Sequence, residues 1–180
     1  MDAGPALAGI IVSAWRWWWP SLDVTLDVSP EVVRVLTGHR QGPLDSECGG
    51  QLFADPRGTG APVLAVATLP HPRDRAGHTW LELDPMRCET EAAHWQSRGL
   101  LRVGVWHTHA EAYPKLSNQD LRSFRAYSRA NQFFPVAVIV GQAAAPDGVR
   151  AWSIREHESP QAQSPDSCPV GSSGSNLPLD

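Results

Sequence analysis

The sequence has little cysteine, almost no lysine and no excess of positive charge. Its formal net charge is −4 at pH 7 and Lys115 is its single lysine, which argues against a nucleic-acid partner because such partners call for a basic face. The three cysteines, Cys48, Cys88 and Cys168, are odd in number and widely spaced. They predict no disulfide framework and favour a cytoplasmic location.

The sequence also has no long apolar run. Its most apolar early stretch, residues 7–19, is interrupted by Arg16 and closed by Pro20, so it falls short of the roughly 20 residues that a membrane-spanning helix needs. It lacks the basic start of a signal peptide as well. With 180 residues, 42% of them hydrophobic and 19% charged, the chain suits a soluble domain with one core.

Composition divides the chain into three zones. Residues 1–21 form an aromatic-rich N-terminal segment, and residues 22–157 have the alternation of apolar segments and turns that a single domain shows. Residues 158–180 are rich in proline, serine and glycine and have little to bury. We expect them to form a disordered tail.

Within the domain, alternating and continuous apolar segments predict seven strands, and capping patterns predict three helices. The expected strands are 24–28, 47–53, 62–68, 79–83, 100–107, 133–140 and 149–154. The expected helices are 30–38, 85–98 and 117–130, and residues 69–77 read as a polar loop. Strands outnumber helices, and the helices lie between them, so the order predicts an α/β (α+β) fold with a mixed sheet and flanking helices.

The N-terminal segment holds four tryptophans within five residues. Its large apolar residues fall at helical spacing, namely Ile11, Trp15, Trp18, Trp19 and Leu22. Such a surface is costly to leave in water. It is expected to pack on the domain as an extra layer, or to dock a partner protein through Trp15, Trp17, Trp18 and Trp19. Contact with a membrane interface is a third alternative.

The strongest chemical signal is a pair of histidines followed by a serine and an aspartate. His107 and His109 are two residues apart at the end of an apolar strand, so their side chains project from one face. The same parity includes Leu101, Val103 and Val105, whereas Trp106 faces the other way and is expected in the core. With Asp120, the two histidines can hold a zinc ion and leave its fourth position open, as metal-assisted hydrolysis requires.

A structural explanation competes for part of this motif. Ser117 and Asp120 stand in the N-cap and N3 positions of a predicted helix, where a side chain of each type bonds the other's backbone. Capping alone would account for both residues. The two explanations are compatible, because a cap would also hold Asp120 in place for a metal.

Other catalytic signatures do not occur in the sequence. It has no H-E-x-x-H pair and no H-x-E with P-C-x-x-C, which argues against a zincin-type metalloprotease and a zinc deaminase. It has no Walker A or dinucleotide-binding fingerprint either.

Together with Glu47 in the segment Ser46-Glu47-Cys48-Gly49-Gly50-Gln51-Leu52, the motif His107, His109, Ser117 and Asp120 resembles the JAB/JAMM (MPN+) metalloproteases. The bacterial branch, with the deconjugating proteases of ubiquitin-like antiphage operons, is the most similar. The resemblance covers residues 24–155 in element order. One departure is Ala110, where the family usually has proline after the second histidine.

The resemblance implies an MPN/cytidine-deaminase-like fold with a mostly antiparallel sheet and one Zn2+ per chain. His107, His109 and Asp120 would be the zinc ligands, and the zinc would activate a water molecule. Glu47 would be the general base and pass the proton to the leaving amine. Ser117 would donate a hydrogen bond to the oxyanion.

The implied activity is that of a zinc-dependent isopeptidase or peptidase, which hydrolyses the bond after the C-terminus of a ubiquitin-like protein by deconjugation or precursor processing. Homologues of activating and conjugating enzymes accompany such proteases in bacteria. An extended tail is expected beside a sheet edge, in a groove bordered by Gly49, Gly50 and residues 69–77. The alternatives are a non-catalytic MPN-type scaffold and a hydrolase with the same metal site but another substrate.

Overall fold

The computed structural model describes residues 13–58, 60–130, 135–154 and 159–163. The strands are β1 (Trp15–Trp19), β2 (Val24–Val28), β3 (Gly49–Asp55), β4 (Val63–Ala67), β5 (Arg75–Gly77), β6 (Trp80–Glu82), β7 (Leu101–Thr108), β8 (Val136–Val140) and β9 (Val149–Ser153). The helices are α1 (Pro30–Gly38), α2 (Pro85–Gln96) and α3 (Asn118–Ala130), with a short 3-10 helix at Pro20–Leu22.

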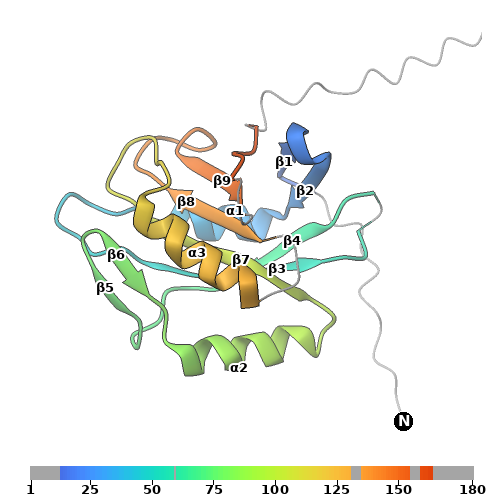
Figure 1. Ribbon diagram of the computed structural model, residues 1–180, viewed down its shortest axis with the longest axis horizontal. Coiled ribbons are helices and arrows are strands. Elements are labelled where there is room, and N and C mark those ends of the chain that lie inside the picture. The colour runs from blue at the N-terminus through green and yellow to red at the C-terminus, as the bar shows by residue number, and fades with distance from the viewer. Residues whose placement is uncertain (1–12, 59, 131–134, 155–158, 164–180) are drawn as a thin grey trace, which may run out of the picture.

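Seven strands form one mixed sheet in the order β1-β2-β4-β3-β7-β8-β9 (Figure 1). The pairs β2–β4 and β7–β8 are parallel, and the other neighbours are antiparallel. This confirms the predicted fold class. The prediction of a loop over residues 69–77 was partly wrong, because Arg75–Gly77 pairs with Trp80–Glu82 as a separate β5–β6 hairpin.

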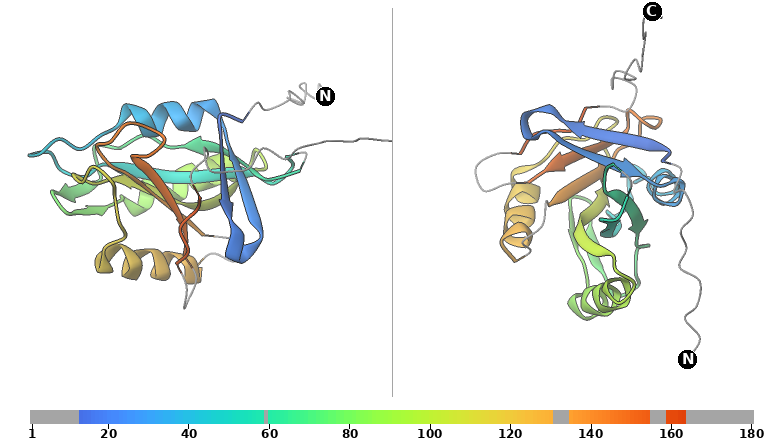
Figure 2. Two further views of the ribbon diagram at one scale, coloured as in Figure 1. Left: turned by 90° about the horizontal axis from the view of Figure 1, so that it is seen from above. Right: turned by 90° about the vertical axis from the view of Figure 1, so that its right-hand side faces the viewer.

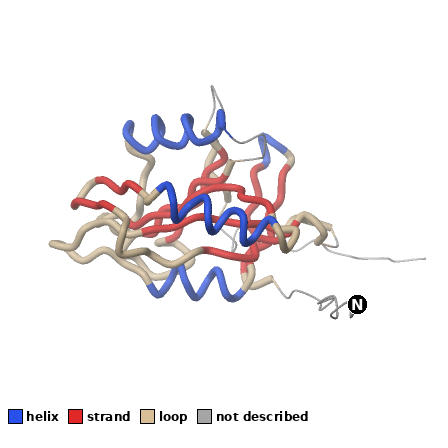
Figure 3. Tube along the Cα trace, turned by 90° about the horizontal axis from the view of Figure 1, so that it is seen from below, coloured by secondary structure: helices blue, strands red, loops and turns tan. Residues whose placement is uncertain are grey.

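The helices cover both faces of the sheet. Leu52 packs with Val32 and Leu36 of α1 in the main core, whereas Phe53 packs with Ala92 of α2. Because successive strand residues point to opposite faces, α1 and α2 lie on opposite sides. Phe124 of α3 forms a third cluster with residues of β8 and β9, and Figures 2 and 3 show α1 and α3 with the sheet between them.

α1 and α2 begin where the capping patterns predicted. The Ser29 hydroxyl accepts a hydrogen bond from Val32 N at 3.3 Å, and the Asp84 carboxylate accepts one from Arg87 N at 2.7 Å. A proline follows each cap residue at the first helical position, where its fixed φ suits the helix. Gly99 follows α2 with φ of +82°, a left-handed conformation that favours glycine.

The N-terminal tryptophans lie on a strand and not on a helix, so the helical interpretation was wrong. β1 pairs with β2 in register, Trp17 opposite Leu26, and its burial alternates, with Trp17 1% and Trp19 0% exposed. Aromatic residues suit a half-buried pleated strand. Trp17 and Trp19 are therefore core residues and unavailable for docking. Docking of a partner through the half-buried Trp15 and Trp18 stays a prediction. Ile11 lies outside the described residues.

The first described residues of the predicted tail join the two ends of the sheet. Gln163 pairs with Trp18 of β1, and Gln161 pairs with Trp152 of β9. Ala162, 8% exposed, donates its N–H to Ala151 O at 2.8 Å, and Gln163 N donates to Trp18 O at 2.8 Å. Residues 161–163 thus cover backbone groups of both edge strands, which sheet proteins otherwise have to protect; the rest of the predicted tail, 164–180, lies outside the described residues.

The pairing of residues 161–163 with both edge strands predicts that removing these residues lowers the stability of the protein. A protein ending at residue 158 should be less stable to urea than one ending at residue 163, by about 2–3 kcal/mol from two to three lost backbone hydrogen bonds. Equal unfolding free energies for the two truncated proteins would contradict a structural role for residues 159–163.

Candidate metal centre

The histidine pair lies at the end of β7, a strand in the middle of the sheet. His107 lies opposite Gly49 of β3, and the β3–β7 register shifts between Leu52 and Phe53. Opposite that shift β7 has one extra residue, so Val103 joins the main core with Trp106, while Val105 packs beside Phe124. The expected single face of 101, 103, 105 and 107 was therefore wrong for Leu101 and Val103, which both pack on the main core, because a bulge reverses the alternation.

Trp106 is a core residue, as predicted. Its side chain is 0% exposed, and its indole donates to Thr68 O at 2.9 Å. A buried indole N–H needs such a partner. The bond ties β7 to the end of β4 directly beside His107.

Glycine lets β3 approach β7 closely where Glu47 enters the site. A Cβ at Gly49 would lie 2.1 Å from Trp106 O and 3.0 Å from the Cα of His107, and one at Gly50 would lie 2.2 Å from Thr68 O. Backbone atoms cannot yield as a flexible side chain can, so a larger residue would push the strands apart. Gly49 thereby allows Glu47 to stand beside the histidines, His107 being 60 residues away in the chain, and Gly50 allows β3 to lie close to the end of β4.

The start of α3 is a reciprocal cap. Asp120 N donates to the Ser117 hydroxyl at 3.0 Å, and Ser117 N donates to Oδ2 of Asp120 at 2.8 Å. The capping interpretation is confirmed. The cap also holds the Asp120 carboxylate toward the histidines instead of competing with them for it.

Three donor groups converge at the end of β7. The Nε2 atoms of His107 and His109 are 3.0 Å apart. Oδ1 of Asp120 lies 3.3 Å from His107 Nε2, and its Oδ2 lies 3.5 Å from His109 Nε2. All three side chains are largely buried, with 8%, 11% and 13% of the side-chain surface exposed for His107, His109 and Asp120.

This arrangement fits a small divalent cation. Ligands about 2.0–2.1 Å from a tetrahedral zinc are separated by about 3.3–3.4 Å, close to the 3.0, 3.3 and 3.5 Å separations here. Two imidazole nitrogens that face one another at 3.0 Å need a shared proton or cation between their lone pairs. The donor set therefore matches what zinc prefers.

Glu47 completes the cluster. Its Oε1 lies 3.9 Å from His109 Nε2, and its side chain is 5% exposed. Among the described residues, Glu47, His107 and His109 also form a group whose ligand atoms all lie within 4.8 Å of one another. The structure thus brings together all four residues that the sequence placed near a metal, with Ser117 at the edge through its bonds to Asp120.

The carboxylates of this cluster have pKa values shifted in opposite directions. Burial raises the pKa of Glu47 from 4.5 to about 7, with His107 lowering it and Asp120 adding to the rise. Burial also acts to raise the pKa of Asp120, but the hydrogen bond and charge of His107 and two hydrogen bonds with Ser117 lower it to about 2. Burial, together with the charge of His107, lowers the pKa of His109.

The shift at Glu47 predicts a pH-dependent stability of the metal-free protein. A carboxyl whose pKa is raised on folding contributes stability that is present below about pH 4.5 and lost as the pH rises through about 7. Glu47→Gln in EDTA should therefore be stabilised relative to the unsubstituted protein by about 3 kcal/mol at pH 8, and by little at pH 4.5. Urea unfolding at both pH values measures this. Glu89→Gln, at a side chain 75% exposed, is the control, and an equal effect of Glu47→Gln at both pH values would contradict the prediction.

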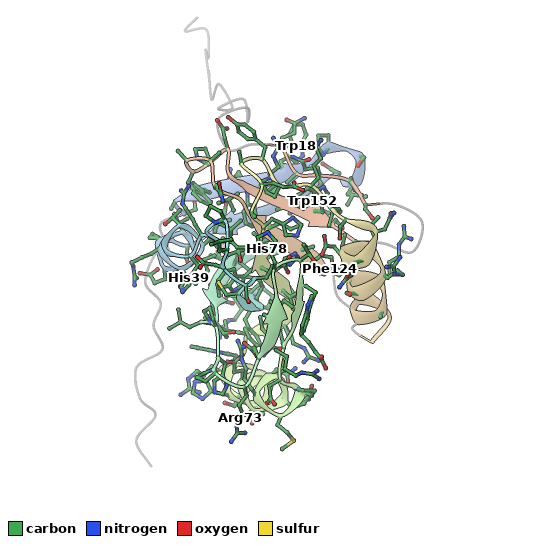
Figure 4. The ribbon with its side chains drawn as sticks, turned by 90° about the vertical axis from the view of Figure 1, so that its left-hand side faces the viewer. Trp18, His39, Arg73, His78, Phe124 and Trp152 are labelled. Carbon is green, nitrogen blue, oxygen red and sulfur yellow. The ribbon has the colours of Figure 1, made fainter. Side chains whose placement is uncertain are left out.

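A pocket opens beside the metal centre between α3 and the β5–β6 hairpin. Its lining includes Glu47, His107 and Asp120 together with apolar side chains of the hairpin region, Trp80, Leu81 and Leu83. In Figure 4, Phe124 comes from α3 and His78 from the turn between β5 and β6. The sequence interpretation placed residues 69–77 beside the groove but missed the β5–β6 pairing and the three lining residues of the hairpin region, although Gly77-His78 between two short segments was an available turn signal.

The fold and the donor set define a mixed α/β domain with a candidate metal centre at the end of a central strand. The family follows from the sequence: residues 29–155 match the prokaryotic homologues of the JAB domain, and the chain belongs to that family. Membership supports a metal-dependent hydrolase. No curated protein matches the chain.

A solved structure supports the fold independently. The solution structure of a protein from Desulfitobacterium hafniense superposes with a TM-score of 0.57 at 16% identity, covering 76% of this chain and 88% of that one. At this identity the likeness concerns the fold alone. In the part of the chain that the structure describes, no helix is long and apolar enough to cross a membrane.

Proposed function

We propose that the protein is a zinc-dependent isopeptidase or peptidase that cuts after the C-terminus of a ubiquitin-like protein. The observation that carries the proposal is the convergence of His107, His109 and Asp120 with a buried carboxylate of raised pKa, Glu47. A metal site that leaves a coordination position open beside a proton acceptor is what hydrolysis of an amide needs.

The two carboxylates divide the roles between them. Asp120 is the nearer to both histidines, and its low pKa keeps it ionised, so with His107 and His109 it would hold the zinc. A zinc ion bound there would supply Lewis acidity, which makes water a better nucleophile and polarises a carbonyl. Glu47, 3.9 Å from His109, stands outside this set and is available for proton transfer.

Glu47 would move one proton in each half of the reaction. As the general base, its carboxylate accepts a proton from the attacking water. It then donates that proton to the nitrogen of the leaving amine while the C–N bond breaks, which returns the carboxylate to its ionised form. Burial raises the pKa of Glu47 to about 7 in the metal-free protein. A zinc ion held by His107, His109 and Asp120 would lower it, because a nearby positive charge favours the carboxylate, so Glu47 would be ionised and ready to accept the first proton.

Ser117 would stabilise negative charge. Its hydroxyl oxygen accepts the N–H of Asp120, which leaves the hydroxyl hydrogen free to donate. The side chain is exposed at the mouth of the site. That hydrogen would be donated to the oxyanion of the tetrahedral intermediate.

The β5–β6 hairpin provides the expected surface for an extended tail. Among the described residues its two strands pair only with each other, so an edge remains for an added strand. Leu81 and Trp80 border the pocket at the metal centre. We propose that the tail of a ubiquitin-like protein lies there, and that homologues of activating and conjugating enzymes make the conjugates that are cut.

The test combines metal content with cleavage. The purified protein should hold one zinc per chain and release the fluorophore from a ubiquitin-like protein that carries 7-amino-4-methylcoumarin at its C-terminus. Stoichiometric zinc without cleavage of several modifiers would instead support a non-catalytic scaffold. Cleavage of an unrelated peptide with equal efficiency would support a hydrolase with another substrate.

A further inference from the structure

A buried ion pair lies at the base of the β5–β6 hairpin and includes none of the residues of the metal centre. The side chains of Arg87 on α2 and Asp74 are 4% and 6% exposed, and their charged groups are in contact. Arg87 Nε also donates to Glu91 at 2.9 Å. The proposed reaction uses none of these groups.

Asp74 accepts hydrogen bonds that join the two ends of the β5–β6 hairpin. It directly precedes β5, and its Oδ1 accepts the N–H of Asp84, the residue that follows the hairpin and caps α2, at 2.9 Å. Its Oδ2 accepts the N–H of His71 at 2.9 Å and a hydrogen bond from Arg87. One carboxylate thus joins the two ends of the hairpin, and Arg87 neutralises it.

The opposite end of the hairpin is tied to the site. Gly77 O accepts the N–H of Glu47 at 2.9 Å, and His78 O accepts a hydrogen bond from the buried Gln41 at 2.7 Å. With its base held by Asp74 and its turn held beside Glu47, the hairpin has a defined position over the pocket that Leu81 lines.

Arg87 also reaches the segment that directly follows β4. Its Nη2 donates to Thr68 Oγ1 and to Leu69 O, each at 2.9 Å. The carbonyl of Thr68 in turn accepts the Trp106 indole. Arg87 therefore connects the hairpin base directly to the residues that follow β4, and through Thr68 it is linked to Trp106 of β7.

A buried ion pair is weak evidence for stability, because desolvation offsets most of its attraction. Its directional bonds do restrict where the joined segments can lie. We propose that Arg87 and Asp74 are positioning residues that hold the β5–β6 hairpin as one wall of the substrate groove. The identity of the substrate in this groove rests on the proposed function. The position of the hairpin does not depend on it.

The proposal predicts a loss of substrate binding with chemistry kept. Arg87→Met and the milder Asp74→Asn should raise KM for the coumarin-linked substrate by about tenfold and leave kcat within about twofold, because the groove wall shifts while the metal centre stays intact. Zinc content should not change. Arg87→Lys should restore little, since an ammonium group cannot reproduce the guanidinium fork.

Two measurements on the full chain separate the position of the hairpin from the identity of its ligand. Hydrogen exchange of backbone amides in residues 75–83 should rise at least tenfold in Arg87→Met and Asp74→Asn, while exchange in β7 stays unchanged. Fluorescence polarisation with a labelled peptide of the last ten residues of ubiquitin, on a Glu47→Gln background, should show a Kd about tenfold higher. Glu91→Gln is the matched control, because it removes the charge of another carboxylate bonded to Arg87, whose other hydrogen bond is to Gln51 of β3 and not to the hairpin.

Unchanged exchange in residues 75–83, relative to Glu91→Gln, would overturn the positioning role. A fall in kcat with KM unchanged would overturn it too, because it would place the effect at the metal centre. If exchange rises but the unsubstituted protein binds no peptide, the positioning role stands and the proposed function is what has failed.

Discussion

Glu47→Gln should lower turnover of a ubiquitin-like substrate by about 10³-fold, within the usual range for losing a general acid–base group. Glutamine keeps the size of the side chain but cannot accept the proton of the attacking water. Zinc content should stay at one per chain, because His107, His109 and Asp120 are unchanged. The measurement is kcat by release of coumarin, with metal content by mass spectrometry.

The control for this experiment is Glu89→Gln, which alters an exposed glutamate of α2 and should leave turnover unchanged. Turnover of Glu47→Gln within tenfold of the unsubstituted protein would contradict its role as the base. Loss of zinc from the same variant would instead indicate that Glu47 is a ligand, as its grouping with the two histidines permits.

Asp120→Asn should distinguish metal binding by Asp120 from its role in the cap of α3. Zinc should stabilise the unsubstituted protein by about 4 kcal/mol when free zinc is about a thousandfold above its Kd. Asp120→Asn should lose most of this gain, because a neutral amide is a poor zinc ligand. Its carbonyl oxygen can still accept the Ser117 N–H, so the metal-free stability should fall by no more than about 1 kcal/mol.

Ser117→Ala is the matched variant, which should weaken the cap and keep the stabilisation by zinc. It removes the hydroxyl that accepts the Asp120 N–H, so the metal-free protein should lose about 1 kcal/mol, while zinc still stabilises it. Thermal unfolding of the unsubstituted protein and the two variants, each with zinc and with EDTA, measures all six states. If Asp120→Asn gained as much from zinc as the unsubstituted protein, Asp120 would be a capping residue only.

Parts of the fold were predictable because their causes are local. Ser29 and Asp84 begin helices by bonding amides three residues away, and the reciprocal cap of Ser117 and Asp120 has the same range. Hydrogen bonds of this reach are decided within one turn of chain. The two histidines share a face for a similar reason, since side chains two apart on a strand point the same way.

Other parts were predicted incorrectly because they depend on a partner strand. The N-terminal tryptophans have both a helical and an alternating spacing, and pairing with β2 selected the strand. The extra residue in β7 follows from its pairing with β3, which placed Val103 on the opposite face from the one expected. The turn of the β5–β6 hairpin has a local signal, but its base is joined by the hydrogen bonds of Asp74 with Asp84 and Arg87, which are 10 and 13 residues away in the sequence.

The sequence alone thus determined the family, the class of fold and the identity of the residues with metal-binding chemistry, because motif spacing and capping act over a few residues. Only the tertiary structure decided that Glu47 reaches the histidines, that Trp17 and Trp19 belong to the core, and that a hairpin borders the site. Those contacts join segments tens of residues apart, and they depend on strand register, bulges and the close approach that Gly49 allows.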